Sequence, residues 1–230
     1  MKIKTAKELA GFIDHTLLKA DADSEQITTL CNEAVKYGFY AVCVHTRWIA
    51  TAADMLEASN VKVTTVISFP HGADSTRIKI AQANRAIQDG ADEIDMVADL
   101  AAIKNTNGKY LSSQLRAMAR LSHAAQPKVA LKVIIEAAAF GINEKMFACG
   151  VASEADADFV KTSTGFHEAG GATVEDVRLM KDAASGCKVK AAGGIRTAKQ
   201  VLAMIKAGAS RIGTSSGVEI IEQFNQQYSR

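Results

Sequence analysis

Three lysines lie inside short apolar segments that otherwise have the composition of buried strands. Lys132 occurs in "ALKVII", Lys161 in "FVKTS" and Lys190 in "KVKAA", and the three are equally spaced along the chain. An aspartate, Asp95, has a similar setting in "EIDMV". Burying an unpaired charge costs several kcal/mol, so these groups must pair with opposite charges or change their protonation state.

Amines that share one poorly solvated space disfavour one another's protonation. A neutral lysine amine is a nucleophile toward carbonyl carbons, with which it forms a Schiff base. The pattern therefore favours imine chemistry assisted by a carboxylate, and it leaves open which of the three lysines attacks. The alternative is a structural ion network, in which the lysines only neutralise Asp14, Asp95 and Glu136.

Glycine-rich segments follow three of the apolar runs, in "HEAGGATVED", "AAGGIRTAKQ" and "GTSSGVEII". Glycines let backbone N–H groups approach an anion, and a helix N-terminus favours negative charge, so these segments are candidates for phosphate binding. Tight turns and helix caps are the alternative for each segment taken alone. The candidate phosphate-binding residues are Gly171, Gly193, Gly194, Ser215 and Ser216, with Arg196 as a further charge or a surface residue.

The elements that must position these residues alternate regularly. Apolar, β-branched runs predict eight strands, near 12–18, 40–45, 61–69, 93–98, 129–137, 158–163, 187–193 and 210–215. Helical periodicity predicts helices over 24–37, 47–58, 74–89, 110–125, 143–154, 173–185, 197–207 and 217–227. The strands are nearly continuous in apolar residues, which is typical of a parallel sheet covered on both faces.

This order predicts an α/β fold, a (β/α)8 TIM barrel formed by a single domain over 1–230. An open doubly wound sheet is the alternative, but no GxGxxG motif follows the first strand. In a barrel the three lysines belong to neighbouring strands. The glycine segments then follow strands 6, 7 and 8, and the loops after strands 7 and 8 often bind phosphate.

Composition excludes several classes of function. The net charge is +2 and no lysine or arginine run occurs, which argues against nucleic-acid binding. No apolar run is long enough for a membrane span, and the first residues lack a signal-peptide core, so we expect a cytoplasmic protein. Four scattered cysteines indicate free thiols, and their spacing does not suggest a metal site.

Seven sequence motifs resemble the deoxyribose-phosphate aldolase family, a family of class I aldolases. They follow the family's order and span nearly the whole chain, and "VKTSTGF" with "KAAGGIR" is the most specific combination. The motifs are "DHTLL" (14–18), "TTVISFPHG" (64–72), "EIDMV" (93–97), "LKVIIE" (131–136), "FVKTSTGF" (159–166), "KAAGGIRT" (190–197) and "RIGTSSG" (211–217).

The resemblance implies reversible cleavage of 2-deoxy-D-ribose 5-phosphate to acetaldehyde and D-glyceraldehyde 3-phosphate, in deoxyribonucleoside catabolism, without a metal or other cofactor. Lys161 would form the Schiff base, Lys190 would stay cationic, and Asp95 would act with Lys190 in proton transfer. Lys132 is expected behind these groups, paired with Asp95 or Glu136. Thr16, Thr162 and Ser163 are candidates for contact with substrate hydroxyls, and the alternative for each is the structural role usual for hydroxyls beside strands. Phosphate binding is expected of Gly171, Gly193, Gly194, Ser215 and Ser216.

The chain departs from the family's usual sequence at 45–49 and 98–110, so we expect any change in substrate preference to originate there. Tyr228, close to the C-terminus, is expected at the surface. Barrels of this type commonly form dimers or tetramers, and we expect a homo-oligomer.

Three other functions remain alternatives. They are a Schiff-base aldolase or transaldolase-like enzyme with other substrates, a non-catalytic phosphosugar-binding barrel, and an isomerase without an imine. The presence of Asp95, Lys161 and Lys190 together counts against the binding protein. The isomerase leaves three lysines in strands without an explanation.

Overall fold

Eight parallel strands form a closed barrel in the order of the chain. The computed structural model describes residues 3–228. The strands are β1 (Ile13–Leu17), β2 (Ala41–Val44), β3 (Lys62–Ile67), β4 (Glu93–Val97), β5 (Ala130–Ile134), β6 (Phe159–Lys161), β7 (Lys188–Ala192) and β8 (Arg211–Thr214). Because β8 pairs with β1, the predicted TIM barrel is confirmed and the open doubly wound sheet is excluded.

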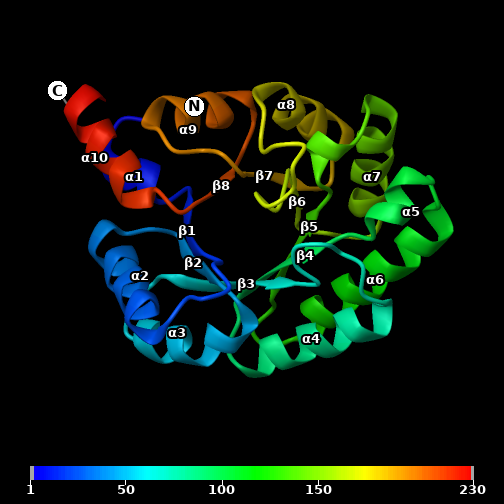
Figure 1. Cartoon of the computed structure of the whole chain (residues 1–230), viewed down its shortest axis with the longest axis horizontal. Coiled ribbons are helices and arrows are strands. Elements are labelled where there is room, and N and C mark those ends of the chain that lie inside the picture. Colours follow the sequence, from blue (N-terminus) through cyan, green and yellow to red (C-terminus); the bar gives the residue numbers. More distant parts are fainter. Residues whose placement is uncertain (1–2, 229–230) are drawn as a thin grey trace.

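Helices surround the strands, as Figure 1 shows. They are α1 (Ala6–Ala10), α2 (Ser24–Tyr37), α3 (Ile49–Leu56), α4 (Thr76–Gln88), α5 (Leu100–Lys104), α6 (Gly108–Ala124), α7 (Ile142–Glu154), α8 (Val174–Ala183), α9 (Ala198–Ala207) and α10 (Gly217–Tyr228). Short 3₁₀ turns cover Thr46–Trp48 and Ala137–Ala139. The sequence did not predict α1 or α5, because each has 5 residues, too few to establish a helical period.

Strand β4 illustrates how the barrel separates apolar from polar side chains. Successive side chains of a strand point to opposite faces. Ile94 and Met96 are fully buried in the main apolar core, together with side chains of the surrounding helices. Glu93 and Asp95 therefore turn to the other face, into the barrel, where they are 5% and 0% exposed.

The strand register brings the charged residues of neighbouring strands side by side. Asp95 of β4 is paired with Lys132 of β5, and Lys161 of β6 is paired with Lys190 of β7. Pairing of β7 with β8 then places Lys190 beside Arg211. With Asp14 of β1, which pairs with Lys190 and Arg211, six of the eight strands contribute charges to one face of the sheet, the inside of the barrel.

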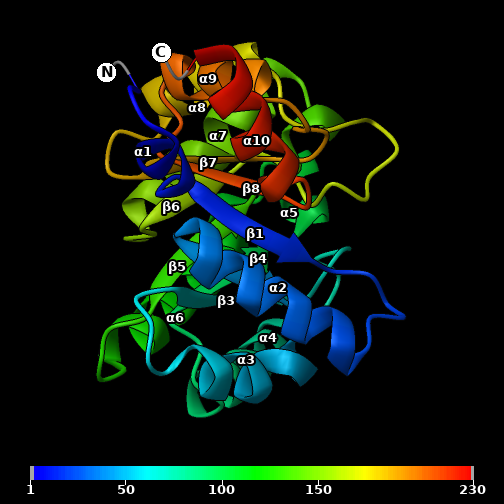
Figure 2. The ribbon, with the colours of Figure 1, turned by 90° about the vertical axis from the view of Figure 1, so that its left-hand side faces the viewer.

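The two ends of the described chain meet on one side of the molecule, where α1 packs against α10 (Figure 2). The side chain of Tyr228, at the end of α10, lies outside the part of the chain that the structure describes. Within residues 3–228, no helix combines the length and apolar character that crossing a membrane requires. The four cysteines are free and buried, as predicted.

Candidate active site

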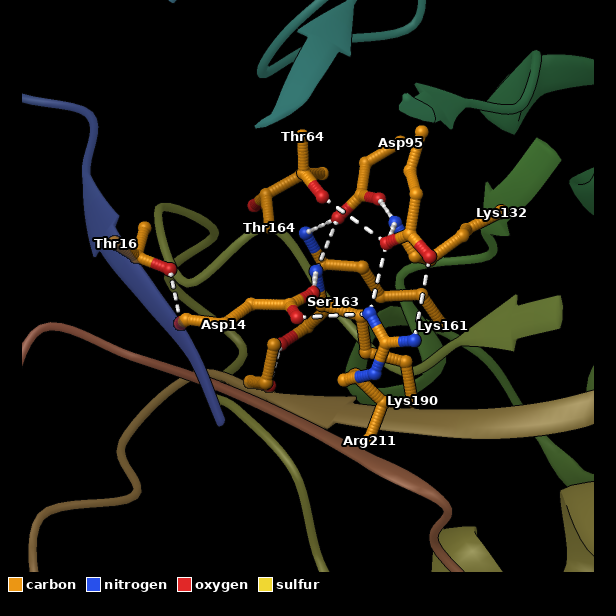
Figure 3. A network of polar contacts seen from close by, with 12 residues as sticks. Asp14, Thr16, Thr64, Asp95, Lys132, Lys161, Ser163, Thr164, Lys190 and Arg211 are labelled. Carbon is orange, nitrogen blue, oxygen red and sulfur yellow. Dashed lines mark hydrogen bonds and ion pairs between the residues drawn. The ribbon is translucent and has the colours of Figure 1, made fainter. Parts of the chain in front are cut away.

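The three strand lysines converge on a single carboxylate inside the barrel (Figure 3). Asp95 Oδ2 lies 2.8 Å from Lys161 Nζ and 2.7 Å from Lys190 Nζ. Its other oxygen, Oδ1, lies 2.7 Å from Lys132 Nζ. The three lysines, which the sequence predicted on neighbouring strands, therefore also lie close together in space, and Asp95 contacts all three.

Two further carboxylates and an arginine extend this cluster. Lys132 Nζ lies 2.7 Å from Glu93 Oε2, and Lys190 Nζ donates a hydrogen bond to Asp14. Arg211 Nη1 connects the two acids, at 2.8 Å from Asp14 Oδ1 and 2.7 Å from Glu93 Oε2. We call the cluster of Asp14, Glu93, Asp95, Lys132, Lys161, Lys190 and Arg211 the barrel network.

Glu136 lies outside the barrel network, although the sequence suggested it as a partner of Lys132. Both of its carboxylate oxygens lie 3.2 Å from the backbone nitrogen of Thr164, which donates to them. Lys132 instead pairs with Glu93 and Asp95. Glu136 therefore holds the chain segment that follows Lys161.

Opposite charges determine the protonation of the buried acids. Burial raises the pKa of Asp95, but the charges of Lys132, Lys161 and Lys190 outweigh burial and hold that pKa well below its usual range. Burial also raises the pKa of Glu93, but Lys132 and Arg211 overcome this and lower it to about 2. Both acids are therefore ionised at neutral pH.

Lys190 is the cation most firmly held by this arrangement. Burial lowers the pKa of Lys190, but the carboxylates of Asp14 and Asp95 outweigh burial and raise the pKa above its ordinary value. Lys190 is fully buried and keeps its proton. A permanent ammonium group thus lies next to Lys161, sharing Asp95 Oδ2 with it.

A cavity of about 240 Å³ opens above the network at the carboxyl ends of the strands. Lys161 lines this cavity and is 3% exposed, whereas Asp95 and Lys190 are fully buried behind it. The other lining residues are Thr16, Leu17, Leu18, Lys19, Thr164, Gly165, Phe166, Ala192, Gly193, Gly194, Ile195, Arg196, Gly213, Thr214 and Ser215. Of the three strand lysines, Lys161 is therefore the one whose amine a ligand in the cavity can reach.

Several candidate phosphate-binding residues line the same cavity, namely Gly193, Gly194, Ser215 and Arg196. Gly193 has φ +94°, and a Cβ there would lie 2.5 Å from Ser163 Oγ, so the turn requires glycine. Gly171 packs against Gly193 from behind, where a Cβ would meet the Gly193 carbonyl. Ser216 lines a neighbouring cavity, between β1, α2 and the start of α10.

The two candidate threonines have different settings. Thr16 lines the cavity and donates from Oγ1 to the Asp14 backbone carbonyl at 2.8 Å. Thr162 is fully buried, and its hydroxyl donates to Ala192 O and accepts from Ala192 N, both at 3.0 Å. Thr162 therefore ties the end of β6 to the end of β7.

The atypical segments at 45–49 and 98–110 do not contribute to the wall of the cavity. The nearer of the two approaches it through His45, whose Nε2 lies 3.1 Å from the carbonyl oxygen of Leu18. The His45 ring also contacts Phe69, which in turn packs edge-on against Phe166. The first segment thus supports the cavity from behind.

Sequence reasoning assigned no role to Glu93, Arg211 or Lys19. Glu93 stands two positions before Asp95, so strand alternation places both on one face of β4. Arg211 is the first residue of β8, and a charged residue at the start of a strand is ordinarily at the surface. Lys19 follows β1 and adds a second cation, with Arg196, to the cavity wall.

Comparisons with known proteins agree with this geometry. The family model described as DeoC/LacD family aldolase matches residues 9–223. A deoxyribose-phosphate aldolase of Thermococcus kodakarensis is 52% identical over 219 residues, which are 94% of this chain and 96% of the relative. A deoxyribose-phosphate aldolase from a Geobacillus species is 50% identical, over 93% of this chain and 95% of the relative.

Solved structures give the same result. A protein of Coccidioides immitis, described as a putative deoxyribose-phosphate aldolase, superposes with a TM-score of 0.92 at 37% identity, over 97% of this chain and 87% of the other. A tetrameric deoxyribose phosphate aldolase from Aeropyrum pernix superposes with a TM-score of 0.89 at 31% identity, over 97% and 93% of the two chains. The chain therefore belongs to the DeoC/LacD family of aldolases.

Proposed function

We propose that the protein catalyses the reversible aldol cleavage of 2-deoxy-D-ribose 5-phosphate to acetaldehyde and D-glyceraldehyde 3-phosphate. One observation carries the proposal. Lys161 lines a cavity that is also lined by glycines of two loops and by Arg196, and its amine lies 2.8 Å from a buried carboxylate. The relatives at about 50% identity are named for this activity.

The reaction begins with attack of the neutral Lys161 amine on the aldehyde carbon of the open-chain sugar. Loss of water from the carbinolamine gives a protonated imine. Breaking the bond between C2 and C3 sends its electron pair into this imine, while the C3 hydroxyl loses its proton and becomes the aldehyde of D-glyceraldehyde 3-phosphate. The resulting enamine takes up a proton at C2, and hydrolysis then releases acetaldehyde and restores Lys161.

Asp95 and Lys190 supply the proton transfers in this scheme. Asp95 Oδ2 contacts both Lys161 and Lys190, so a carboxylate and an ammonium group would be available to exchange protons with the intermediates formed on Lys161. Lys132 does not line the cavity. It holds Asp95 from the opposite side at 2.7 Å.

The phosphate of the substrate would lie against Gly193, Gly194 and Ser215, with Arg196 and Lys19 as the nearby cations. Thr16 is placed to contact a sugar hydroxyl from the same wall. Gly171 and Thr162 would act by holding the loops, because both pack against the segment that carries Gly193. We also propose that the protein forms a homo-oligomer, since the Aeropyrum pernix relative is described as tetrameric. Its reaction would belong to the breakdown of deoxyribonucleosides.

The test is an assay of the purified protein with 2-deoxy-D-ribose 5-phosphate, in which D-glyceraldehyde 3-phosphate is detected by coupled reduction with NADH. We expect cleavage that disappears when Lys161 is replaced by alanine. Other phosphorylated aldol substrates serve as controls for a different aldolase. A folded protein that cleaves another substrate, or none, would contradict the proposal.

A further inference from the structure

The barrel network extends through the interior from one end of the barrel to the other. Lys161 ends β6 and reaches the cavity at the carboxyl ends of the strands. Glu93 and Arg211 are the first residues of β4 and β8, and both line a second cavity of about 610 Å³ at the opposite opening. Lys132 connects the two ends, with Asp95 on one side and Glu93 on the other.

The charges of the network do not balance when every member is ionised. It contains four cations, namely three lysines and an arginine, and three carboxylates. All seven side chains are at least nine-tenths buried, so an excess positive charge is poorly solvated. Loss of one proton from an amine brings the connected network to zero charge.

The number of partners indicates which amine gives up this proton. Lys190 contacts Asp14 and Asp95, and Lys132 contacts Glu93 and Asp95. Among residues 3–228, Lys161 forms an ion pair with Asp95 alone, through the oxygen that Lys190 also uses. Deprotonating Lys161 therefore removes the fewest favourable ion pairs and relieves its repulsion with Lys190.

We propose that Glu93 and Arg211, at the end of the barrel away from the cavity, are positioning residues that set the protonation of Lys161 by fixing the charge of the barrel network. Arg211 holds Asp14 and Glu93 in place and supplies the fourth cation. Glu93 supplies the third carboxylate and orients Lys132 toward Asp95. The inference rests on the proposed function, since it concerns the nucleophile of that reaction.

Other titratable groups face Lys161 without joining the network. Burial raises the pKa of the Cys43 thiol, on β2, to about 11, so this group is uncharged at neutral pH. Lys19 and Arg196 share the cavity wall, and Glu136 lies beyond Thr164. Their charges are the same in every variant below, so they shift all pH profiles together.

The test compares single and paired charge removal. Glu93→Gln removes a negative charge, so Lys161 loses its proton more readily and the acid limb of the pH profile moves to lower pH. Arg211→Gln removes a positive charge, and the limb moves to higher pH. The expected displacement is about one pH unit in each case, for a charge several ångströms away in a partly screened interior.

The double variant Glu93→Gln with Arg211→Gln restores the wild-type charge, and its profile is expected to return to the wild-type position. Arg211→Lys is a second control, because it keeps the charge but not the paired contacts. The measured quantity is the rate at which acetaldehyde is reductively trapped on Lys161 by cyanoborohydride, followed from pH 5 to pH 9 by peptide mass spectrometry. Circular dichroism establishes that each variant is folded.

A purely structural role would slow trapping in both single variants without displacing the profiles in opposite directions. Shifts in one direction, or no shifts, overturn the inference while trapping in the wild type leaves the proposed function intact. Absence of the Lys161 adduct in the wild type overturns both. If one single variant does not fold, the other single variant compared with Arg211→Lys gives the same test.

Discussion

Lys79 and Lys161 are both buried lysines, but they differ in their partners and in their access to a cavity. Lys79, in α4, donates to the Val97 carbonyl at 2.8 Å and to Gln114 Oε1 at 3.0 Å, both uncharged acceptors. Burial lowers the pKa of Lys79 to about 8. Lys161 instead contacts the ionised Asp95 and lines the cavity.

The comparison shows that an easily lost proton is insufficient for a catalytic lysine. Lys79 is 0% exposed, enclosed by acceptors from β4 and α6, and has no carboxylate partner among the described ion pairs. Lys161 has access to a cavity, a neighbouring ammonium group and a carboxylate that can carry protons. Access to the cavity and contact with a carboxylate, in addition to burial, distinguish Lys161 from Lys79.

The largest expected effect separates the two lysines by activity. Lys161→Ala should reduce cleavage by more than about 10³-fold, because the nucleophile is lost. Lys79→Met should change the rate by less than about threefold, since Lys79 lies outside the cavity. Steady-state kinetics on both folded variants measures the difference. Comparable losses in the two variants would break the distinction between them.

The second expected effect concerns acid stability, in which the network and Lys79 should also differ. The folded-state pKa of Glu93 is about 2, below the ordinary value of 4.5, so its contribution is complete above about pH 4.5. It is lost as the pH falls toward 2, by an amount on the order of 3 kcal/mol, of which about 2 kcal/mol is lost by pH 3.

Urea unfolding at pH 6 and pH 3 measures this dependence. The wild type should lose more stability than Glu93→Gln over that interval, whereas Lys79→Met should lose as much as the wild type. Equal acid sensitivity in the wild type and in Glu93→Gln would contradict the stabilising role of ionised Glu93.

A third prediction tests the cavity that Lys161 lines and Lys79 does not. Ser215→Asp places a negative charge on the wall expected to hold phosphate, and KM for 2-deoxy-D-ribose 5-phosphate should rise at least about tenfold. KM for unphosphorylated deoxyribose should change far less. Ser216→Asp is the matched control, because Ser216 lines the neighbouring cavity and not this one, and a larger effect there would move the phosphate site into that neighbouring cavity.

The smallest expected effect is a gain in the stability of the folded protein at high pH, which Lys79 provides. Its folded-state pKa of about 8 lies below the ordinary 10.5, so the folded protein releases this proton first. Stability of the wild type relative to Lys79→Met should therefore rise between pH 8 and pH 10, by on the order of 1 kcal/mol. Urea unfolding at the two pH values measures it, and a constant difference would contradict the lowered pKa.

The sequence predicted the barrel and the strand positions of the central residues because strand period and charge are local signals. Lys132, Lys161 and Lys190 stand out against apolar neighbours, and equal spacing indicated neighbouring strands. The parts not predicted depend on tertiary contacts. Arg211 and Glu93 are at strand starts, where charges are ordinary, and only barrel closure brings Arg211 of β8 to Glu93 of β4.

Lys79 was not predicted for a related reason. Its segment has the polar composition of an exposed helix, and burial results from packing of α4 on α6. Gly171 and Ser216 likewise belong to the glycine segments that the sequence singled out. In the fold, Gly171 packs behind Gly193, and Ser216 lines the adjoining cavity. Loop conformation, rather than motif, decides which residues of a glycine segment line the cavity.

The most direct test of the central claim is to map where acetaldehyde becomes attached. The purified protein is incubated with acetaldehyde, reduced with borohydride, digested and analysed by mass spectrometry. We expect an N-ethyl group on Lys161, with Lys79, Lys132 and Lys190 unmodified. An adduct on one of those three lysines, or no adduct above the level of surface lysines in a folded sample, would contradict it.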